Sequence, residues 1–229
     1  MQNEVTFTDL IASSIHDMKN SLNLQISALE KITVQCRERG DISAVNDLGP
    51  VIYQANRINL NLVELLSLYK MDKSMYPLDI DEHAIAELIE EAMLQNQPMM
   101  DFKGIALSVD CAPDCYWYVE RELIKGVLMN ALNNAYNYTT DRIHVLARIA
   151  DNRLELRVED NGAGYPDRML QAEGLSSKTG VNFESGSTGL GFYFADQVVR
   201  LHRNGGRCGT LSIENGGSLG GGCFVVRLP

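Results

Sequence analysis

The stretch RELIKGVLMNALNNAYNYT (residues 121–139) decides how the second half of the chain is understood. Its apolar residues recur at helical spacing, so we expect one helix over this range. Four asparagines fall within eight residues of it, although asparagine is only a modest helix former. Three of them, Asn130, Asn134 and Asn137, are spaced i, i+4 and i+7, which places them on one helical face. That face is either a solvated polar surface or a row of amides suited to Mg²⁺ and polyphosphate.

Two glycine-containing turns follow this helix. The segment VEDNGAGYP (158–166) contains Asp160-x-Gly162-x-Gly164, in which glycines permit close backbone approach and the acid can accept a hydrogen bond from an exocyclic amine such as that of adenine. The segment STGLGFYF (187–194) places Gly189 and Gly191 before a helical pattern, and helix N-termini favour phosphate. Each turn alone is weak evidence, since glycine-rich turns are common.

The first part of the chain shows two apolar stripes at helical spacing. The first stripe consists of Ile11, Ile15, Met18, Leu22, Ile26, Leu29, Ile32 and Cys36; the second consists of Val51, Ala55, Ile58, Leu62, Leu65 or Leu66, and Tyr69. Thr8 and Asp9 are plausible N-cap residues of the first helix, RERGD (37–41) predicts a turn, and Pro50 suggests a start or kink in the second helix. A lone hairpin cannot cover both stripes. We therefore expect a second copy to complete a four-helix bundle, with packing on the chain's own C-terminal part as the alternative.

The rest of the chain alternates between strand and helix patterns. Strands are expected at 104–110, 115–120, 142–150, 153–160, 209–215 and 222–229, helices at 81–96, 121–139 and 191–202, and a long polar loop at 161–188. Mostly antiparallel pairing suggests one sheet with one helical layer. The predicted fold class is α+β, with a two-helix hairpin over residues 1–75 followed by an α/β sandwich over residues 76–229.

Composition limits the partners. The net charge of −10 argues against nucleic acid or anionic lipid as the main partner. Five scattered cysteines suggest reduced thiols, and the pair Cys111 and Cys115, with no second pair, predicts ordinary burial rather than a metal site. No apolar run approaches the ~20 residues of a membrane span, and no signal peptide is visible, so we expect a cytoplasmic protein without a direct membrane span.

A third motif lies in the first predicted helix. SSIHDMKNSL (13–22) sets His16 beside Asp17, with Asn20 one turn later. With this motif included, the chain resembles the two-component sensor histidine kinases. IHDMKNSL looks like their H box, LMNALNNAYNYT like the N box, EDNGAGYP like the G1 box and STGLGF like the G2 box, in the family's order and from about residue 8 to the C-terminus.

The resemblance implies two domains. Residues 1–73 would be the dimerisation and phosphoacceptor hairpin, with a homodimer formed through residues 8–73. Residues 76–229 would be a Bergerat-type ATP-binding domain, with residues 166–188 as its ATP lid. Asn134 matches the Mg²⁺-binding asparagine and Asp160 the adenine-binding aspartate. The other implied nucleotide-binding residues are Asn130, Asn137, Tyr138, Gly162, Gly164, Thr188, Gly189, Leu190 and Gly191.

By the same resemblance His16 is the phosphoacceptor. Asp17 can orient its imidazole and accept its proton, and Asn20 could hold a water in line with a phospho-aspartate. The expected activity is autophosphorylation of His16 from ATP and Mg²⁺, transfer to an aspartate in the receiver domain of a response regulator, and dephosphorylation of that regulator. The hairpin pattern begins close to Met1, so the chain is either the catalytic portion of a longer protein or a stand-alone kinase that takes its signal from a separate sensory partner. The closing strand ends where family members often end and the initial Met looks native, so we favour a natural stand-alone protein.

The chain departs from the family pattern at two motif positions. Asn137 stands where the N box often has lysine, and Ser21 where many H boxes have proline. Three alternatives remain. The first is a histidine phosphotransfer or phosphatase scaffold with a weakened ATP site. The second is a Bergerat-type ATPase or anti-sigma-type serine kinase, which leaves the His16 hairpin unexplained. The third is a module that senses nucleotide without catalysis.

Overall fold

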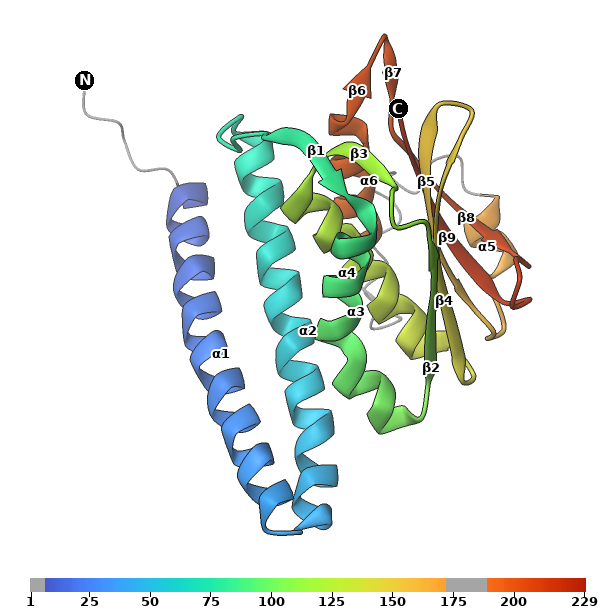
Figure 1. The fold of residues 1–229 in the computed structure, drawn as a ribbon. Helices are drawn as coiled ribbons and strands as arrows, with labels where there is room; N and C mark the ends of the chain where they lie inside the picture. Colours follow the sequence, from blue (N-terminus) through green and yellow to red (C-terminus); the bar gives the residue numbers. More distant parts are fainter. Residues whose placement is uncertain (1–6, 172–188) are drawn as a thin grey trace, which may run out of the picture. The chain divides into compact units, whose positions relative to one another are not determined.

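The computed structural model describes residues 7–171 and 189–229, with side chains from residue 8 onward (Figure 1). The chain divides into two compact units, Met1–Tyr76 and Pro77–Pro229. Within the described ranges no helix has the length and apolar character needed to cross a membrane.

The first unit is a helical hairpin of α1 (Phe7–Glu38) and α2 (Ile42–Asp72). Gly40, with φ of +73°, provides the left-handed residue of the turn, and Asp41 caps α2 by accepting a hydrogen bond from the Ala44 amide at 3.0 Å. At the other end of the hairpin, the Tyr69 hydroxyl donates to the Asp9 carboxylate. Both ends of the two-helix unit are therefore fixed by polar contacts that the chain itself supplies.

The structure decides between the two roles predicted for Pro50 and corrects one detail of the first helix. The second helix begins at Ile42, where Asp41 caps it, so Pro50 lies inside α2, the position that the kink alternative required, and not at its start. The first helix begins at Phe7, so Thr8 and Asp9 lie in its first turn instead of at its N-cap. Asp9 uses its carboxylate for the Tyr69 contact.

The first apolar stripe is only partly covered. Ile15 and Ile26 are buried, whereas Ile11, Met18 and Ile32 of the same stripe are exposed. An exposed row of large apolar side chains on a long helix is a surface suited to association.

The second unit contains a five-stranded sheet. Its elements are β1 (Ile80–Ala84), α3 (Ile85–Lys103), β2 (Ala106–Cys111), β3 (Tyr116–Glu120), α4 (Arg121–Tyr138), β4 (Arg142–Ala150), β5 (Arg153–Asp160), α5 (Asp167–Leu170), α6 (Leu190–Leu201), β6 (Arg203–Asn204), β7 (Arg207–Cys208), β8 (Thr210–Asn215) and β9 (Gly222–Leu228). The strand order is β2-β4-β5-β9-β8, with β2 and β4 parallel and the other neighbours antiparallel. Strands β1 and β3 form a separate antiparallel ribbon, as do β6 and β7.

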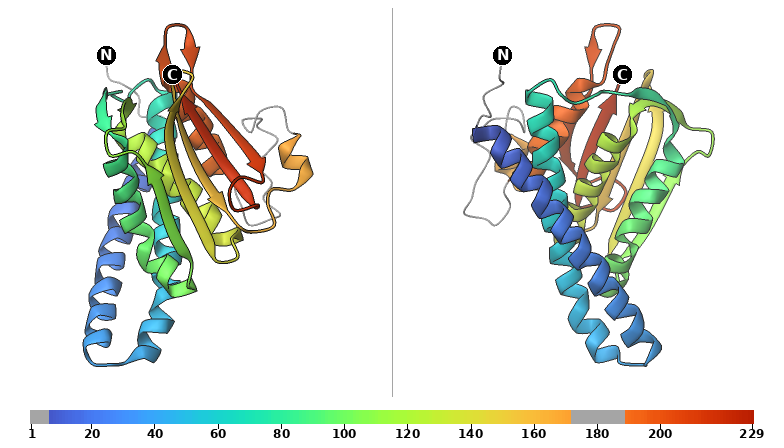
Figure 2. Two further views of the ribbon diagram at one scale, coloured as in Figure 1. Left: turned by 45° about the vertical axis from the view of Figure 1, so that its right-hand side comes forward. Right: turned by 90° about the vertical axis from the view of Figure 1, so that its left-hand side faces the viewer.

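Helices α3, α4 and α6 cover one face of this sheet (Figure 2). Along β5 the residues that point to the helices, Leu154, Leu156 and Val158, are apolar and buried, as the period of two requires. From the helical side, Ile124 and Phe194 are among the fully buried side chains. The second unit is thus an α/β sandwich, and the predicted α+β class is confirmed.

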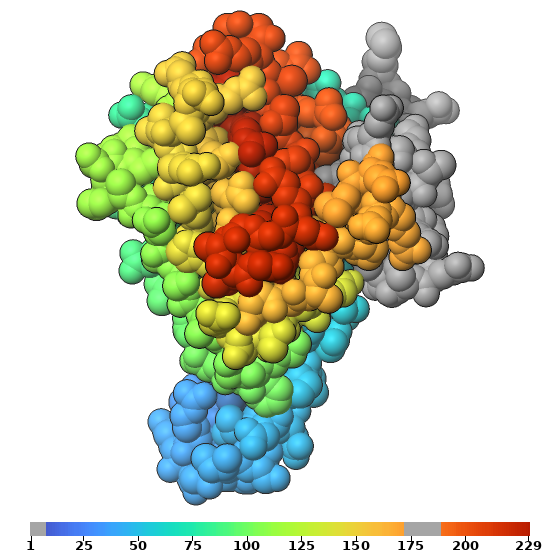
Figure 3. Space-filling view, turned by 90° about the vertical axis from the view of Figure 1, so that its right-hand side faces the viewer, coloured from blue at the N-terminus to red at the C-terminus, as the bar shows by residue number. Residues whose placement is uncertain are grey.

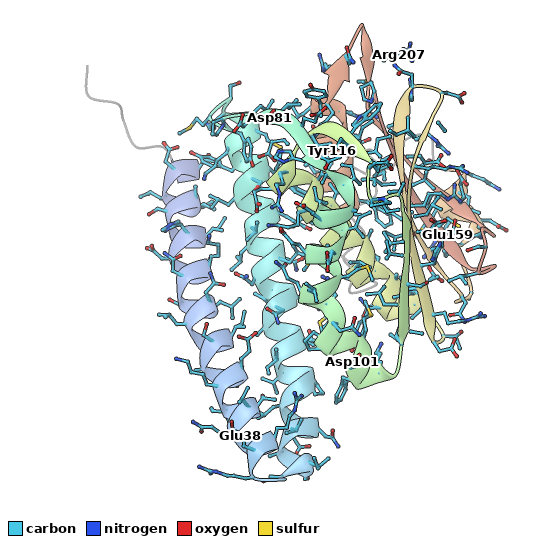
Figure 4. The ribbon with its side chains drawn as sticks, viewed as in Figure 1. Glu38, Asp81, Asp101, Tyr116, Glu159 and Arg207 are labelled. Atoms are coloured by element: carbon cyan, nitrogen blue, oxygen red, sulfur yellow. The ribbon has the colours of Figure 1, made fainter. Side chains whose placement is uncertain are left out.

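The opposite face of the sheet carries charged side chains and is visible in Figure 3. Glu155 on β5 lies 2.7 Å from Arg148 on β4 and 2.7 Å from Arg227 on β9. Two residues further along β5, Glu159 (labelled in Figure 4) accepts from Arg157 at 2.9 Å and from the Ser218 hydroxyl at 2.7 Å. Both glutamates are only 5% exposed, so they depend on these donors.

Several predicted elements need correction. The segment predicted as a helix over 81–96 begins as strand β1, and the helix that follows extends past Pro98 to Lys103. The expected loop contains the one-turn helix α5, and the short strands β6 and β7 were not predicted. Strands β6 and β7 have two residues each, too few to show a period, whereas β1 is defined by its pairing with β3.

The glutamates predict loss of stability in acid. Burial alone would raise the pKa of Glu155, but hydrogen bonds from Arg148 and Arg227 outweigh it and hold the pKa below its usual value. A carboxyl group with a depressed folded-state pKa stabilises the fold above its unfolded pKa of about 4.3, and this contribution is lost as pH falls below that value. We expect the urea midpoint of the full chain, followed by fluorescence of its single tryptophan, Trp117, to fall between pH 7 and pH 4.

Glu155→Gln tests the cause. At pH 7 it should cost about 1.5–3 kcal/mol, the worth of hydrogen bonds to a charged group, and it should reduce the difference between pH 7 and pH 4. Glu122→Gln is the matched control, because Glu122 pairs with Lys125 on the exposed side of α4 and should change little. An unchanged pH dependence in Glu155→Gln would contradict the assignment.

Candidate functional site

The asparagines of α4 do not all present the same atoms. Asn130 is buried, and its Oδ1 accepts a hydrogen bond from Nδ2 of Asn134 at 3.1 Å. This leaves Oδ1 of Asn134 without a hydrogen bond from the described residues. Nδ2 of the exposed Asn137 donates to the Asn133 carbonyl at 2.9 Å. Asn134 therefore presents an oxygen, the ligand atom that Mg²⁺ prefers, whereas the Asn137 amide is engaged with its own helix.

The carboxylate of Asp160 lies at the end of β5 and is buried. Its Oδ1 accepts hydrogen bonds from the backbone amides of Gly162 at 2.7 Å and of Gly222 at 3.2 Å. No described residue donates to Oδ2. One oxygen of Asp160 thus holds the backbone, and the other is available to an external donor such as an amine.

Gly162 lies against the end of α4. A Cβ at this position would be 2.0 Å from the carbonyl oxygen of Tyr138, a backbone atom, so only glycine fits without displacing the helix end. Gly164 follows with φ of +77°, and Asn215 packs where its side chain would be. The close approach at Gly162 brings Asp160 to the C-terminal end of α4, on which Tyr138 is exposed.

Asn161, between Asp160 and Gly162, connects the end of β5 to the loop before β4. Its Oδ1 accepts from the Asp141 amide at 3.1 Å, the Arg142 amide at 3.0 Å and the Thr139 hydroxyl at 2.9 Å. Its Nδ2 donates to the Asp141 carboxylate at 2.7 Å. The side chain therefore fixes the position of the turn that carries Asp160.

The N-terminus of α6 meets α4 at Asn130. Gly189, with φ of +63°, precedes the helix, and no side chain of the described residues caps it. A Cβ on Gly191 would be 2.0 Å from Nδ2 of Asn130, so the first turn of α6 lies directly on this buried amide. Leu190 begins the helix between the two glycines. Thr188 lies outside the described residues, as does most of the proposed lid.

Comparisons with known proteins agree with this geometry. Residues 119–229 match the family described as histidine kinase-, DNA gyrase B-, and HSP90-like ATPase. The match includes α4, the Asp160 turn and α6, which are the three elements that form the site.

The curated relatives that match across the chain are named sensor proteins. The chain is 24% identical over 227 residues to sensor protein SrrB of Staphylococcus aureus (strain N315), which covers 96% of this chain and 38% of the relative. It therefore spans less than half the length of the curated relatives that it matches. The resemblance to two-component sensor histidine kinases is confirmed.

Two solved structures share the fold. The catalytic domain of histidine kinase ThkA has a TM-score of 0.56 at 20% identity and covers 66% of this chain and 95% of that chain. Acinetobacter baumannii histidine kinase AdeS has a TM-score of 0.59 at 18% identity and covers 89% of this chain and 96% of that chain.

A second group of candidate residues lies in the first unit, on α1. The His16 side chain is 56% exposed, and its Nδ1 is 3.4 Å from Oδ1 of Asp17 and 3.3 Å from Nδ2 of Asn20. Both contacts use the same ring nitrogen, so Nε2 has no partner among the described residues. With the proton on Nδ1, facing Asp17, the lone pair is on the exposed Nε2.

The cysteines are not arranged for metal binding. No group of three His, Cys, Asp or Glu side chains in the described ranges could hold a metal ion. Cys115 is buried and Cys111 half-buried. Burial and the neighbouring Cys115 thiol raise the pKa of Cys111 to about 11, so this thiol stays protonated at neutral pH and is a poor ligand.

Sequence reasoning missed three residues of the ATPase site. Asn161 and Tyr165 lie within the quoted turn but were given no role. Asn215 holds the backbone of Tyr165, accepting from its amide at 2.6 Å and donating to its carbonyl at 2.8 Å. Asn161 and Tyr165 had a local signal, namely polar and aromatic residues inside a glycine turn, whereas Asn215 lies 50 residues away and had none.

Asn161→Ala is expected to destabilise the ATPase unit. The change removes the acceptor of two backbone amides and one hydroxyl, which should cost about 2 kcal/mol in the free energy of unfolding. Urea denaturation followed by Trp117 fluorescence measures this. The matched control is Asn204→Ala, in the exposed β6–β7 ribbon, which should change the free energy by less than about 0.5 kcal/mol. Equal effects of the two changes would show that the Asn161 contacts do not fix the turn.

Proposed function

We propose that this chain is an ATP-dependent protein-histidine kinase that phosphorylates His16. The observation that carries the proposal is the contact between Asn130 and Gly191, which joins the amide face of α4 to the N-terminus of α6. A helix N-terminus favours phosphate through its dipole and its backbone amides. An amide oxygen beside it, that of Asn134, suits the cation that accompanies polyphosphate.

ATP and Mg²⁺ fit the residues present. Oδ2 of Asp160 is available to the exocyclic amine of adenine, with Gly162, Gly164 and Tyr138 around the base. Gly189, Leu190 and Gly191 would contact the phosphates, together with Thr188 by analogy with the family. Asn134 would hold Mg²⁺ through Oδ1, with Asn130 and Asn137 on the same helix. The cation supplies neutralisation of charge on the transferred phosphoryl group.

The chemistry at His16 follows from its contacts. The phosphoryl acceptor must be a nitrogen with a free lone pair, and exposed Nε2 meets that requirement when Asp17 holds the proton on Nδ1. Asp17 also stabilises the positive charge that develops on the imidazole when Nε2 forms a bond to phosphorus. Nδ2 of Asn20 lies 3.3 Å from Nδ1 and can donate to it only in the other tautomer, in which Nδ1 carries no proton. When Asp17 holds the proton on Nδ1, the Asn20 amide is free to turn outward and orient a water molecule.

The remaining parts of the proposal concern organisation and partners. Residues 1–75 form the phosphoacceptor domain and residues 76–229 the ATP-binding domain. The exposed side chains Ile11, Met18 and Ile32 support a homodimer through residues 8–73, with a four-helix bundle at its centre. His16 passes the phosphoryl group to an aspartate of a response regulator receiver domain, and Asn20 assists its hydrolysis. A separate sensory partner and a cytoplasmic location complete the proposal.

One observation favours a second candidate, a phosphatase or phosphotransfer scaffold with a weakened ATP site. Asn137 occupies the position at which the family often has lysine, and its amide donates to its own helix. A charge-assisted phosphate contact is worth about 1.5–3 kcal/mol. Its absence would weaken ATP binding and shift the balance towards dephosphorylation.

Incubation with γ-labelled ATP and Mg²⁺ is the test. We expect acid-labile, base-stable label on the chain, because a phosphorylated histidine has that stability, and loss of the label in His16→Gln. His144→Gln is the matched control and should retain the label, since His144 lies on β4 beside Ser108, outside the proposed site.

Two outcomes would contradict the kinase proposal. Label that persists in His16→Gln would exclude His16 as the acceptor. Binding of ATP without any label would favour the scaffold. Asn134→Ala should abolish the label in a chain that still folds, although it lowers the urea midpoint because Oδ1 of the buried Asn130 loses the Asn134 donor. Retained label would refute the Mg²⁺ assignment.

Asn20→Ala separates the two directions of phosphoryl transfer. Autophosphorylation should stay within about twofold of the unaltered chain, because the Nδ1 contact to Asp17 remains. Dephosphorylation of a phosphorylated receiver domain should fall by about 10²-fold or more, the usual contribution of a positioned proton-transfer or water-orienting group. Asn23→Ala, on the same helix, is the control. Unchanged dephosphorylation in Asn20→Ala would remove this residue from the reverse reaction.

A further inference from the structure

Tyr165 is held at the ATPase site by backbone contacts. Its amide and its carbonyl form two hydrogen bonds with the side chain of Asn215, at 2.6 and 2.8 Å. Its ring meets Phe192 of α6 edge-on, with ring centroids 6.2 Å apart and planes at 70°. Phe192 in turn packs against Phe224 of β9, with ring centroids 5.7 Å apart. Tyr165 is therefore fixed relative to both α6 and the sheet.

The ring of Tyr165 packs within the fold, whereas its hydroxyl makes no hydrogen bond with the described residues. Burial, and then the negative charge of nearby Asp160, raise its pKa, so the hydroxyl keeps its proton at any physiological pH. Tyr165 is half-buried, and a protonated hydroxyl in such a place is a donor that favours a partner.

Tyr165 and the unused oxygen of Asp160 border the same space. A Cβ on Gly222 would be 2.8 Å from Oδ2 of Asp160 and 3.1 Å from Cε2 of Tyr165. That ring carbon is bonded to the carbon that bears the hydroxyl. Oδ2 of Asp160 and the ring edge of Tyr165 thus both lie against Gly222. Neither Oδ2 nor the Tyr165 hydroxyl has a hydrogen-bond partner among the described residues.

This pair matches one edge of adenine. The exocyclic N6 amine of adenine donates a hydrogen bond, and the adjacent ring nitrogen N1 accepts one. A protein recognises this edge with an acceptor opposite N6 and a donor opposite N1. Guanine presents an oxygen in place of the amine, and that oxygen would face the Asp160 carboxylate, acceptor against acceptor. Such an unpaired arrangement is disfavoured in a buried site.

We infer that Tyr165 is a specificity-determining residue whose hydroxyl donates a hydrogen bond to N1 of adenine while Asp160 accepts from N6. The inference rests on the proposed function, since it assumes that ATP binds at Asp160. Tyr165 would recognise N1 of adenine, a second atom of the base in addition to the N6 amine.

The test compares ATP with 1-deaza-ATP, in which a carbon replaces N1, on the full chain with Mg²⁺ by calorimetry. The unaltered chain should bind ATP about fivefold more tightly, the usual worth of one neutral hydrogen bond. Tyr165→Phe keeps the ring and its contacts, so it should fold normally, bind 1-deaza-ATP unchanged, and bind ATP no better than 1-deaza-ATP. Tyr116→Phe removes a hydroxyl from the exposed ribbon (Figure 4) and should keep the fivefold preference.

The outcomes separate the inference from the proposed function. If the unaltered chain binds both nucleotides equally, or if Tyr165→Phe keeps the preference for ATP, the inference is overturned and ATP binding stands. If Tyr165→Phe weakens both nucleotides by the same factor, the hydroxyl acts through packing and the inference is again overturned. If the unaltered chain binds neither nucleotide, the proposed function fails and the inference with it.

Discussion

The second unit depends on the carboxylate of Asp160, which fixes three pieces of backbone at one point. Its Oδ1 holds the amides of Gly162 and Gly222, so the end of β5 is tied both to the turn that follows it and to the start of β9. The Asp160 carbonyl accepts from the Gly221 amide at 3.1 Å, which doubles the connection. A buried carboxylate needs such donors, because an ionised group without them is costly to desolvate. The hydrogen bonds to Oδ1 hold the backbone together at this point, and they leave Oδ2 of Asp160 available to a ligand.

The glycines around Asp160 follow from the same constraint. A side chain at Gly162 would meet the Tyr138 carbonyl, and one at Gly222 would meet Oδ2 of Asp160 and the Tyr165 ring. At Gly162 backbone therefore approaches backbone, and at Gly222 two side chains approach the backbone. At Gly191 the close neighbour is instead the buried amide of Asn130, which is why α6 begins on α4. These glycines look like ordinary turn residues in the sequence. In the structure they are the positions at which α4, α6 and the end of β5 come into contact.

This explains which parts of the molecule the sequence could predict. Strands β4 and β5 have the predicted bounds, because eight or nine alternating residues and an Asp151-Asn152 turn specify them locally. Strand β1 was mistaken for the start of a helix, because Asp81 and Glu82 resemble a helix N-terminus and its partner Trp117–Tyr118 lies far along the chain. The candidate site residues come from short motifs and were found by spacing and order. The clamp of Asn215 on Tyr165 joins residues 50 positions apart, and no local pattern encodes such a contact.

The two candidate sites are built on different physical principles, and this bears on what each can do. The α1 group is made by one helix: His16, Asp17 and Asn20 are within four residues, their side chains are exposed, and their contacts exceed 3.2 Å. Such contacts in solvent are individually weak, so the imidazole can exchange its Nδ1 partner between an acid and an amide without disturbing the fold. The ATPase site is instead assembled from distant segments around buried groups, and its geometry is fixed. This division suits the proposed function, because catalysis by positioning requires a rigid donor site, whereas an acceptor proposed to work in two directions would have to change partners.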